Sequence, residues 1–139
     1  MQYLRKAMMF IVVAGLAVSF TGCPLLNSFT IQIDNLGNNI AVTVVRLVNF
    51  EADENVTDNI LPVDVGPGVT RRVVVTMDDA GDANALKIRV ESTNPQQPLS
   101  FTVTRVVEGG LAAGKTVYVT VEGSPTQSVS VQVDAEDEA

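Results

Sequence analysis

Histidine and tryptophan are absent from this sequence, and cysteine occurs only once, at Cys23. Without histidine the chain lacks the residue that most often serves as a general base or a metal ligand. Without tryptophan it lacks the best aromatic surface for a cation. A single cysteine excludes a disulfide within the chain, so the folded state must be held together by its hydrophobic core.

Positive charge is also scarce. All 16 acidic residues but only seven of the nine basic residues lie after residue 22, which gives that part of the chain a net charge of −9. Such a surface repels phosphate backbones and anionic lipid headgroups. We therefore expect no nucleic acid partner, and we expect any membrane attachment to work without a basic patch.

The first 22 residues have the organisation of an export signal. Arg5 and Lys6 make the start cationic, and residues 7–18 form an uncharged apolar run of 12 residues. That length suits the hydrophobic region of a signal peptide, whereas a membrane-spanning helix needs about 20 residues. We expect residues 1–22 to form a signal helix that is removed from the mature protein.

The apolar run leads to Phe20-Thr21-Gly22-Cys23, which resembles the lipobox of bacterial lipoprotein precursors. Thr21, Gly22 and Cys23 match that pattern, and Phe20 stands where leucine is usual. The resemblance implies cleavage between Gly22 and Cys23 and attachment of lipid chains to Cys23, of which two or three anchor a protein firmly. Pro24, rather than aspartate, follows the cysteine, which implies the outer membrane if the host is Gram-negative.

Two alternatives to lipidation remain open at this point. An ordinary secretory signal cut after Ser19 would release the domain, and an uncleaved helix would hold it in the membrane. The position of the only cysteine directly after the apolar run favours lipidation. On that interpretation, residues 23–28 form a short tether, which spans at most about 17 Å over its last five residues.

From residue 28 onward, apolar and polar residues alternate with a period of two. This period is typical of half-buried β-strands, and no window of helical length shows a period of 3.6. The pattern predicts seven strands, at residues 29–34, 40–50, 73–77, 86–91, 101–104, 117–122 and 128–133, with a short eighth near 60–65. We therefore expect one all-β domain over residues 29–133, a seven- to eight-stranded antiparallel β-sandwich, followed by a frayed acidic tail at 134–139.

Two local signals interrupt the alternation. Residues 35–39 (NLGNN) tolerate positive φ and predict a hairpin between the first two strands. The alternation breaks at Val44-Val45, which predicts either a β-bulge or a strand buried on both faces.

Two further stretches resemble segments of bacterial immunoglobulin-like domains, namely residues 65–76 (VGPGVTRRVVVT) and 111–121 (LAAGKTVYVTV). In both, a glycine-containing turn launches a strand rich in β-branched residues. The resemblance implies an immunoglobulin-like sandwich, although the disulfide and buried tryptophan of true immunoglobulin domains are missing.

Acidic residues gather in two predicted loops. Asp78, Asp79, Asp82 and Asn84 supply the hard oxygen ligands that calcium prefers, but Ala80 and Ala83 break the EF-hand spacing, so a solvated turn is the simpler interpretation. The second loop, residues 51–68, is long enough to suggest a binding role. Its second half, 60–65, resembles an edge strand that Pro62 protects from further pairing, and Arg71-Arg72 are interpreted as the solvated start of the next strand.

Catalysis fits this composition poorly. A serine nucleophile without histidine would need a lysine base, and after residue 22 only Lys87 and Lys115 are available. We therefore expect a membrane-anchored lipoprotein of the bacterial cell envelope with a structural or protein-interaction role. We expect this lipoprotein to have no cofactor, and we expect its partner to be another envelope protein close to the membrane. A calcium- or ligand-binding β-sandwich module is the alternative function.

Overall fold

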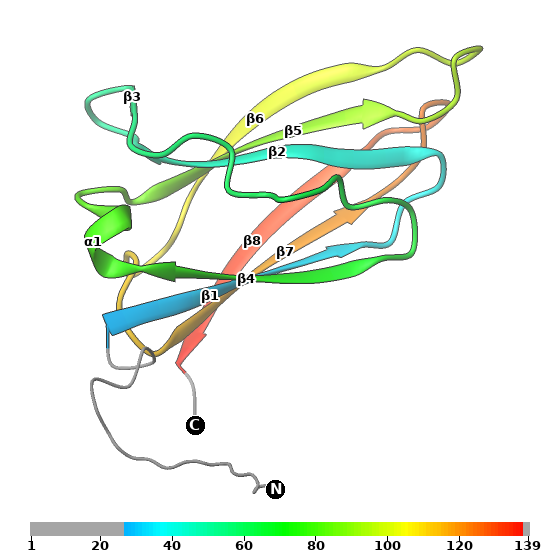
Figure 1. Ribbon diagram of the computed structural model, residues 1–139. Coiled ribbons are helices and arrows are strands. Elements are labelled where there is room, and N and C mark those ends of the chain that lie inside the picture. Colours follow the sequence, from blue (N-terminus) through cyan, green and yellow to red (C-terminus); the bar gives the residue numbers. More distant parts are fainter. Residues whose placement is uncertain (1–26, 138–139) are drawn as a thin grey trace, which may run out of the picture.

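The computed structural model describes residues 27–137, and these residues form eight strands and one helix (Figure 1). The strands are β1 (Ser28–Asn35), β2 (Ile40–Asn49), β3 (Glu54–Asn55), β4 (Thr70–Thr76), β5 (Ala85–Ser92), β6 (Ser100–Val106), β7 (Lys115–Glu122) and β8 (Ser130–Asp137). The one-turn helix α1 (Met77–Ala80) joins β4 to β5. No helix within residues 27–137 is long and apolar enough to cross a membrane.

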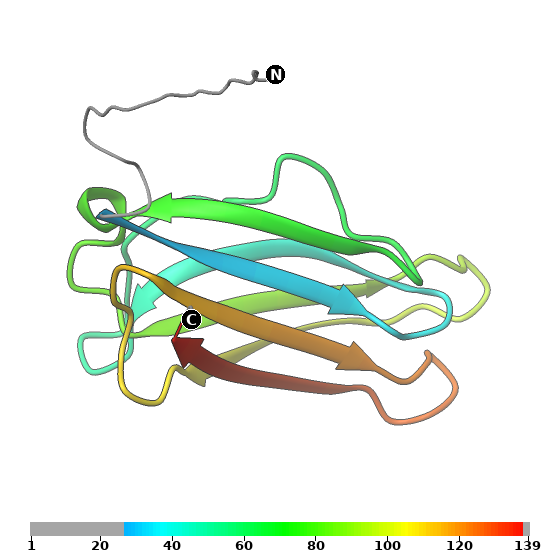
Figure 2. The same cartoon turned by 90° about the horizontal axis from the view of Figure 1, so that it is seen from below.

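The strands form two four-stranded sheets, which confirms the all-β sandwich. One sheet has the order β4-β1-β7-β8, and the other has the order β3-β2-β5-β6. Figure 2 shows the first sheet from below, with its four strands side by side. The predicted signal helix, residues 1–22, lies outside the described residues.

The core lies between the sheets and is built from alternate residues of the strands, as a period of two requires. Three predicted inward rows are completely buried: Phe29, Ile31 and Ile33 in β1, Leu86, Ile88 and Val90 in β5, and Val117, Val119 and Val121 in β7. In the predicted rows of β6 and β8, Val131 is buried in the core, and the other members pack against it with partial exposure. Hydrophobic alternation therefore located the core-facing side of each of these strands.

The connection between β1 and β2 crosses from one sheet to the other, so the predicted hairpin is wrong. The two strands belong to different sheets. Residues 35–39 do contain a positive φ, at Asn39 (58°), but the turn they form links layers rather than neighbouring strands. Gly37 is required there because an added Cβ would collide with the side chain of Ile40.

This crossover changes the neighbours of β1. It lies in the interior of its sheet, antiparallel to β4 on one side and parallel to β7 on the other. The expectation of purely antiparallel pairing is therefore wrong. The immunoglobulin-like order is wrong as well, because it keeps the first two strands in the same sheet. Local turn residues indicate where a chain reverses but leave open which sheet it enters.

Asn35 holds the crossover in place. Its side chain is completely buried, and its Nδ2 donates hydrogen bonds to the carbonyls of Ile40 (2.9 Å) and Val65 (3.0 Å). Its Oδ1 accepts a hydrogen bond from the backbone N–H of Gly37 (3.0 Å). All the hydrogen-bonding groups of this amide except one lone pair are therefore used, which makes its burial tolerable.

The predicted irregularity at Val44-Val45 is a β-bulge. The register of β2 against β5 shifts between Val42 and Val44, so Thr43 is the extra residue. The bulge restores the inward orientation of Val45, which is completely buried. The bulge alternative is thereby confirmed.

The acidic tail predicted at residues 134–139 belongs to β8 as far as Asp137, so the frayed tail is wrong over that stretch. β8 pairs antiparallel with β7 along its whole length. Ala135 packs against the core, while Asp134 and Glu136 are exposed. The alternation thus continues into the acidic stretch, where a count of charges alone suggested disorder.

Replacing Asn35 with alanine should lower the free energy of unfolding by about 2 kcal/mol, because it removes the side-chain partner of the Gly37 N–H and the Ile40 carbonyl and one of the two hydrogen bonds to the Val65 carbonyl. Asn38→Ala is the matched control, since the Asn38 side chain is exposed. Urea unfolding followed by circular dichroism measures both variants. Equal losses in the two would show that the buried amide does not hold the crossover.

Candidate interaction surface

The residues proposed as calcium ligands have other roles in the fold. Asp78 and Asp79 lie in the first turn of α1 and are exposed, and the backbone N–H of Asp79 is capped by the Thr76 hydroxyl (3.2 Å). Part of the predicted loop is therefore a helix. Asp82 accepts a hydrogen bond from the Asn49 side chain (3.0 Å).

Asn84 faces the turn after β2 rather than the aspartates. Its Oδ1 accepts a hydrogen bond from the N–H of Phe50 (2.9 Å), and its Nδ2 donates one to Glu51 (2.6 Å). Within residues 27–137, no three acidic, cysteine or histidine side chains lie close enough together to hold a metal ion. These polar groups serve to join the turns at one end of the sandwich.

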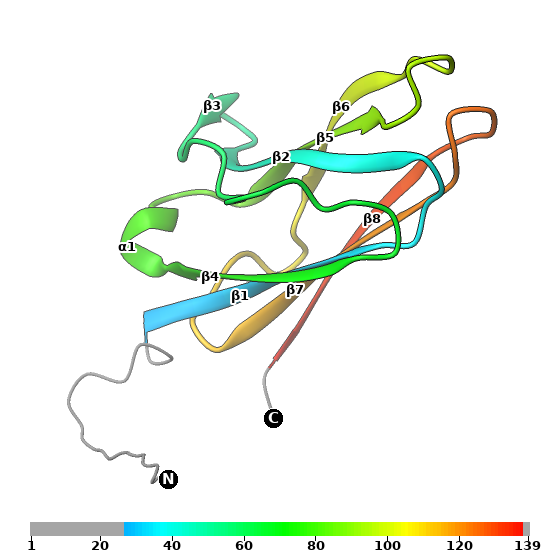
Figure 3. The same ribbon diagram turned by 45° about the vertical axis from the view of Figure 1, so that its right-hand side comes forward.

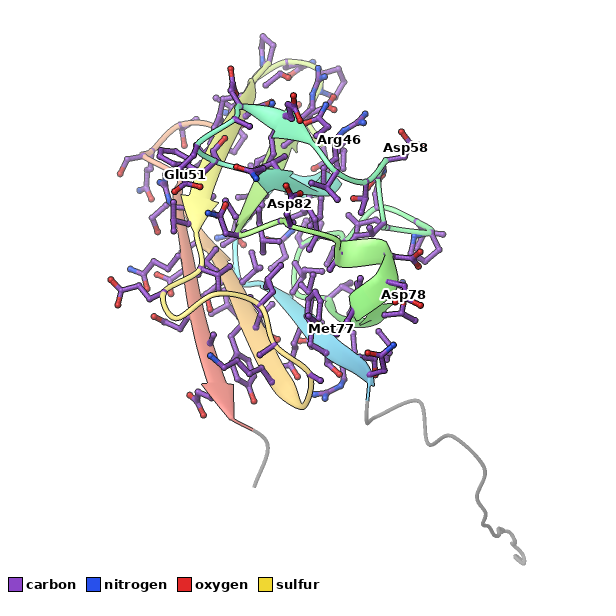
Figure 4. All side chains as sticks on the ribbon, turned by 90° about the vertical axis from the view of Figure 1, so that its left-hand side faces the viewer. Arg46, Glu51, Asp58, Met77, Asp78 and Asp82 are labelled. Carbon is purple, nitrogen blue, oxygen red and sulfur yellow. The ribbon has the colours of Figure 1, made fainter. Side chains whose placement is uncertain are left out.

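The proposed lipidation and cleavage residues, Cys23 and Gly22, lie outside the described residues. The start of β1, to which they lead, lies at the same end of the sandwich as α1 and β3 (Figure 1). Figure 4 views this end directly and shows Glu51, Asp78 and Asp82 on it. Acidic side chains thus lie at the end of the sandwich where β1 begins, and of the three Asp78 is nearest to that point.

The long segment of residues 51–68 covers the free edge of β2 (Figure 3). Two polar side chains replace backbone groups in this contact. Asn59 accepts a hydrogen bond from the N–H of Val45 and donates one to the carbonyl of Thr43, both at 3.0 Å, and the Thr57 hydroxyl accepts one from the N–H of Leu47 (3.0 Å). The segment therefore satisfies a strand edge without being a strand.

The eighth strand predicted near residues 60–65 is accordingly wrong, although its position at a sheet edge is right. Ile60 donates its N–H to the carbonyl of Val45 (2.9 Å), and Val65 forms a single isolated bridge with Val42. The eighth strand is instead β3, only two residues long. A segment that pairs partly through side chains shows no period of two and cannot be found by alternation.

A groove of about 410 Å³ separates this covering segment from β4. One wall is formed by residues 56–60 and the other by residues 73–75, with Asp79 at the α1 end. Because β4 pairs with β1 alone, its other edge lies along this groove. The groove thus presents the backbone edge of a strand together with valine side chains.

The other strand edges among the described residues are protected. β3 is too short to offer a template, and β6 and β8 lie beside each other, where Arg105 donates a hydrogen bond to the carbonyl of Val131 (3.0 Å). β8 also exposes Asp134 and Glu136. β4, by contrast, exposes Val74 to 58% and lacks such protection, which makes it the candidate interaction surface.

The basic pair at the start of β4 is divided between two environments. Arg72 is exposed on the outer face and donates a hydrogen bond to Gln32 of β1. Arg71 points inward and is half-buried, and its Nε has no hydrogen-bond partner within residues 27–137. The predicted solvated start is therefore right for Arg72 and wrong for Arg71.

No protein-family model, curated protein or solved structure matches the chain.

Asn59→Ala should lower the free energy of unfolding by about 1–3 kcal/mol, because the N–H of Val45 and the carbonyl of Thr43 lose their partner. Hydrogen exchange at the Val45 amide should become faster. Asp58→Ala is the control, because this fully exposed carboxylate only approaches Arg46 at 3.7 Å. Unchanged exchange at Val45 in Asn59→Ala would contradict the covering role of the segment.

Proposed function

We propose that this protein is a lipid-anchored protein of the bacterial cell envelope, and that its sandwich is a non-enzymatic module that binds another protein chain. The observation that carries the interaction role is the open edge of β4 beside the groove. An extended peptide that adds to such an edge gains backbone hydrogen bonds, and pockets for its side chains give specificity.

The anchor rests on the sequence before the fold. A cationic start, an apolar run of 12 residues and the Phe20-Thr21-Gly22-Cys23 stretch follow one another in the order of a lipoprotein precursor. β1 begins at Ser28, so the anchored cysteine would lie within about 17 Å of the sandwich. Pro24 after the cysteine supports the outer membrane as the destination in a Gram-negative host.

The short tether brings the acidic end of the sandwich close to the lipid. Charge alone suggests that the least acidic face of the domain should lie nearest the membrane, because that face would be repelled least by anionic headgroups. Glu51, Asp78 and Asp82 lie at this end instead (Figure 4). The lipid chains would therefore hold the domain against a mild electrostatic repulsion, and the open edge of β4 would extend away from the anchored end.

Replacing Cys23 with serine should remove the protein from the membrane fraction and leave precursor or soluble protein, because the thiol that carries the lipid is lost. Detergent partitioning of wild type and Cys23→Ser measures this, and identical partitioning would overturn the lipid anchor.

On a sucrose gradient the wild type from a Gram-negative host should sediment with outer-membrane markers. Sedimentation with inner-membrane markers would contradict the proposed destination.

A photo-crosslinking residue at position 74 tests the interaction role. Val74 is exposed beside the groove, so it should form adducts with a protein partner in membranes. Val106 in β6 is the matched control, because it is also a strand valine with high exposure (45%). Adducts at position 74 that are at least several-fold more abundant than at position 106 support the proposal. Equal or absent adducts would refute it.

A further inference from the structure

We infer that the chain which pairs with β4 is the β4 strand of a second copy of this protein, in an antiparallel arrangement related by a two-fold axis. The inference deepens the interaction role proposed above and rests on it, but it does not depend on the lipid anchor. It assigns to the open edge one partner of defined chemistry, which joins the two sheets of neighbouring molecules into one continuous sheet.

The geometry of β4 suits such a pairing. Its burial alternates, with Thr70, Arg72, Val74 and Thr76 on the exposed face and the residues between them turned inward. All seven residues pair with β1 without a bulge, so the strand presents a regular edge. Residues rich in β-branched side chains favour a pleated, paired conformation.

The charges along β4 are self-complementary. Arg71 and Arg72 lie near its start, and Asp78 and Asp79 follow its end in α1. An antiparallel neighbour brings the basic end of one strand beside the acidic end of the other. β4 and α1 together carry two basic and two acidic residues and are neutral, whereas the part of the chain after residue 22 carries a net charge of −9. At physiological salt, repulsion between the remaining charges is screened beyond about 8 Å.

The register that satisfies these charges is centred on Val74. It sets Arg72 opposite Thr76 of the other copy, two residues before Asp78. Centring on Val73 would set Arg72 opposite Val74, farther from the acidic residues, and a centre at Arg72 would oppose two like charges and is disfavoured. In the favoured register the stem of Arg72 packs on a β-strand side chain that is exposed in the single chain. The groove of about 410 Å³ leaves space for the inward side chains of the added strand.

A charge-reversal series on the full-length chain in mild detergent tests this pairing. Sedimentation equilibrium should show a dimer of the wild type at about 100 µM. Arg72→Glu should weaken association at least tenfold, because it adds an acidic residue near Asp78 and Asp79 of the neighbour. The double variant Arg72→Glu, Asp78→Lys should recover the dimer, since it restores opposite charges at both ends.

Cysteine crosslinking identifies the surface. Under mild oxidation, Val74→Cys should form a disulfide-linked dimer, because the two copies of residue 74 face each other at the two-fold axis, where their Cα atoms lie within the range that a disulfide spans. Val106→Cys, another exposed strand valine but at the end of β6 in the other sheet, should not. A monomeric wild type, a dimer insensitive to Arg72→Glu, or equal crosslinking at both positions would overturn self-pairing. Adducts of position 74 with a different protein in membranes, without self-association, would keep the interaction role and refute the second copy.

Discussion

The buried amide of Asn35 is the contact on which the arrangement of the sheets depends. Its side chain holds the start of β2 and the carbonyl of Val65, and its own backbone bonds to Gly68 and Val69 at 2.8 and 3.1 Å. One residue thus joins the end of β1, the start of β2 and the segment that leads into β4. Because β4 enters beside β1 at this point, the pairing of the first sheet and the passage to the second sheet are fixed together.

The exposed edges of the sandwich follow from this arrangement. Because β1 lies in the interior of its sheet, β4 and β8 are the edge strands of that sheet. β3 and β6 are the edge strands of the other sheet. The protein protects most of them, by a very short strand, by the Arg105 contact between β6 and β8, and by the side chains of Asn59 and Thr57 along β2. β4 remains without such protection, and an unprotected strand edge is a ready template for pairing with another chain.

Charge is distributed unevenly between the two ends of the sandwich. Acidic side chains lie at the end of the sandwich where β1 begins, and two of them, Asp82 and Glu51, accept hydrogen bonds from Asn49 and Asn84. These two residues thereby take part in joining the turns at this end. The basic residues Arg71 and Arg72, in contrast, lie on the open strand, where their charges bear on what the strand can pair with.

The sequence by itself determined the all-β class and the core-facing side of β1, β4, β5, β6, β7 and β8, because burial of alternate side chains is a local pattern. It also marked the irregularity at Val44-Val45, but it left open whether this was a bulge or a strand buried on both faces. Tertiary structure alone decided that β1 crosses to the other sheet and that β4 keeps an open edge. The decisive hydrogen bonds of Asn35 and Asn59 reach partners 30 and 16 residues away. No local pattern marks which asparagine will be buried, since that depends on which distant carbonyls the folded chain brings beside it.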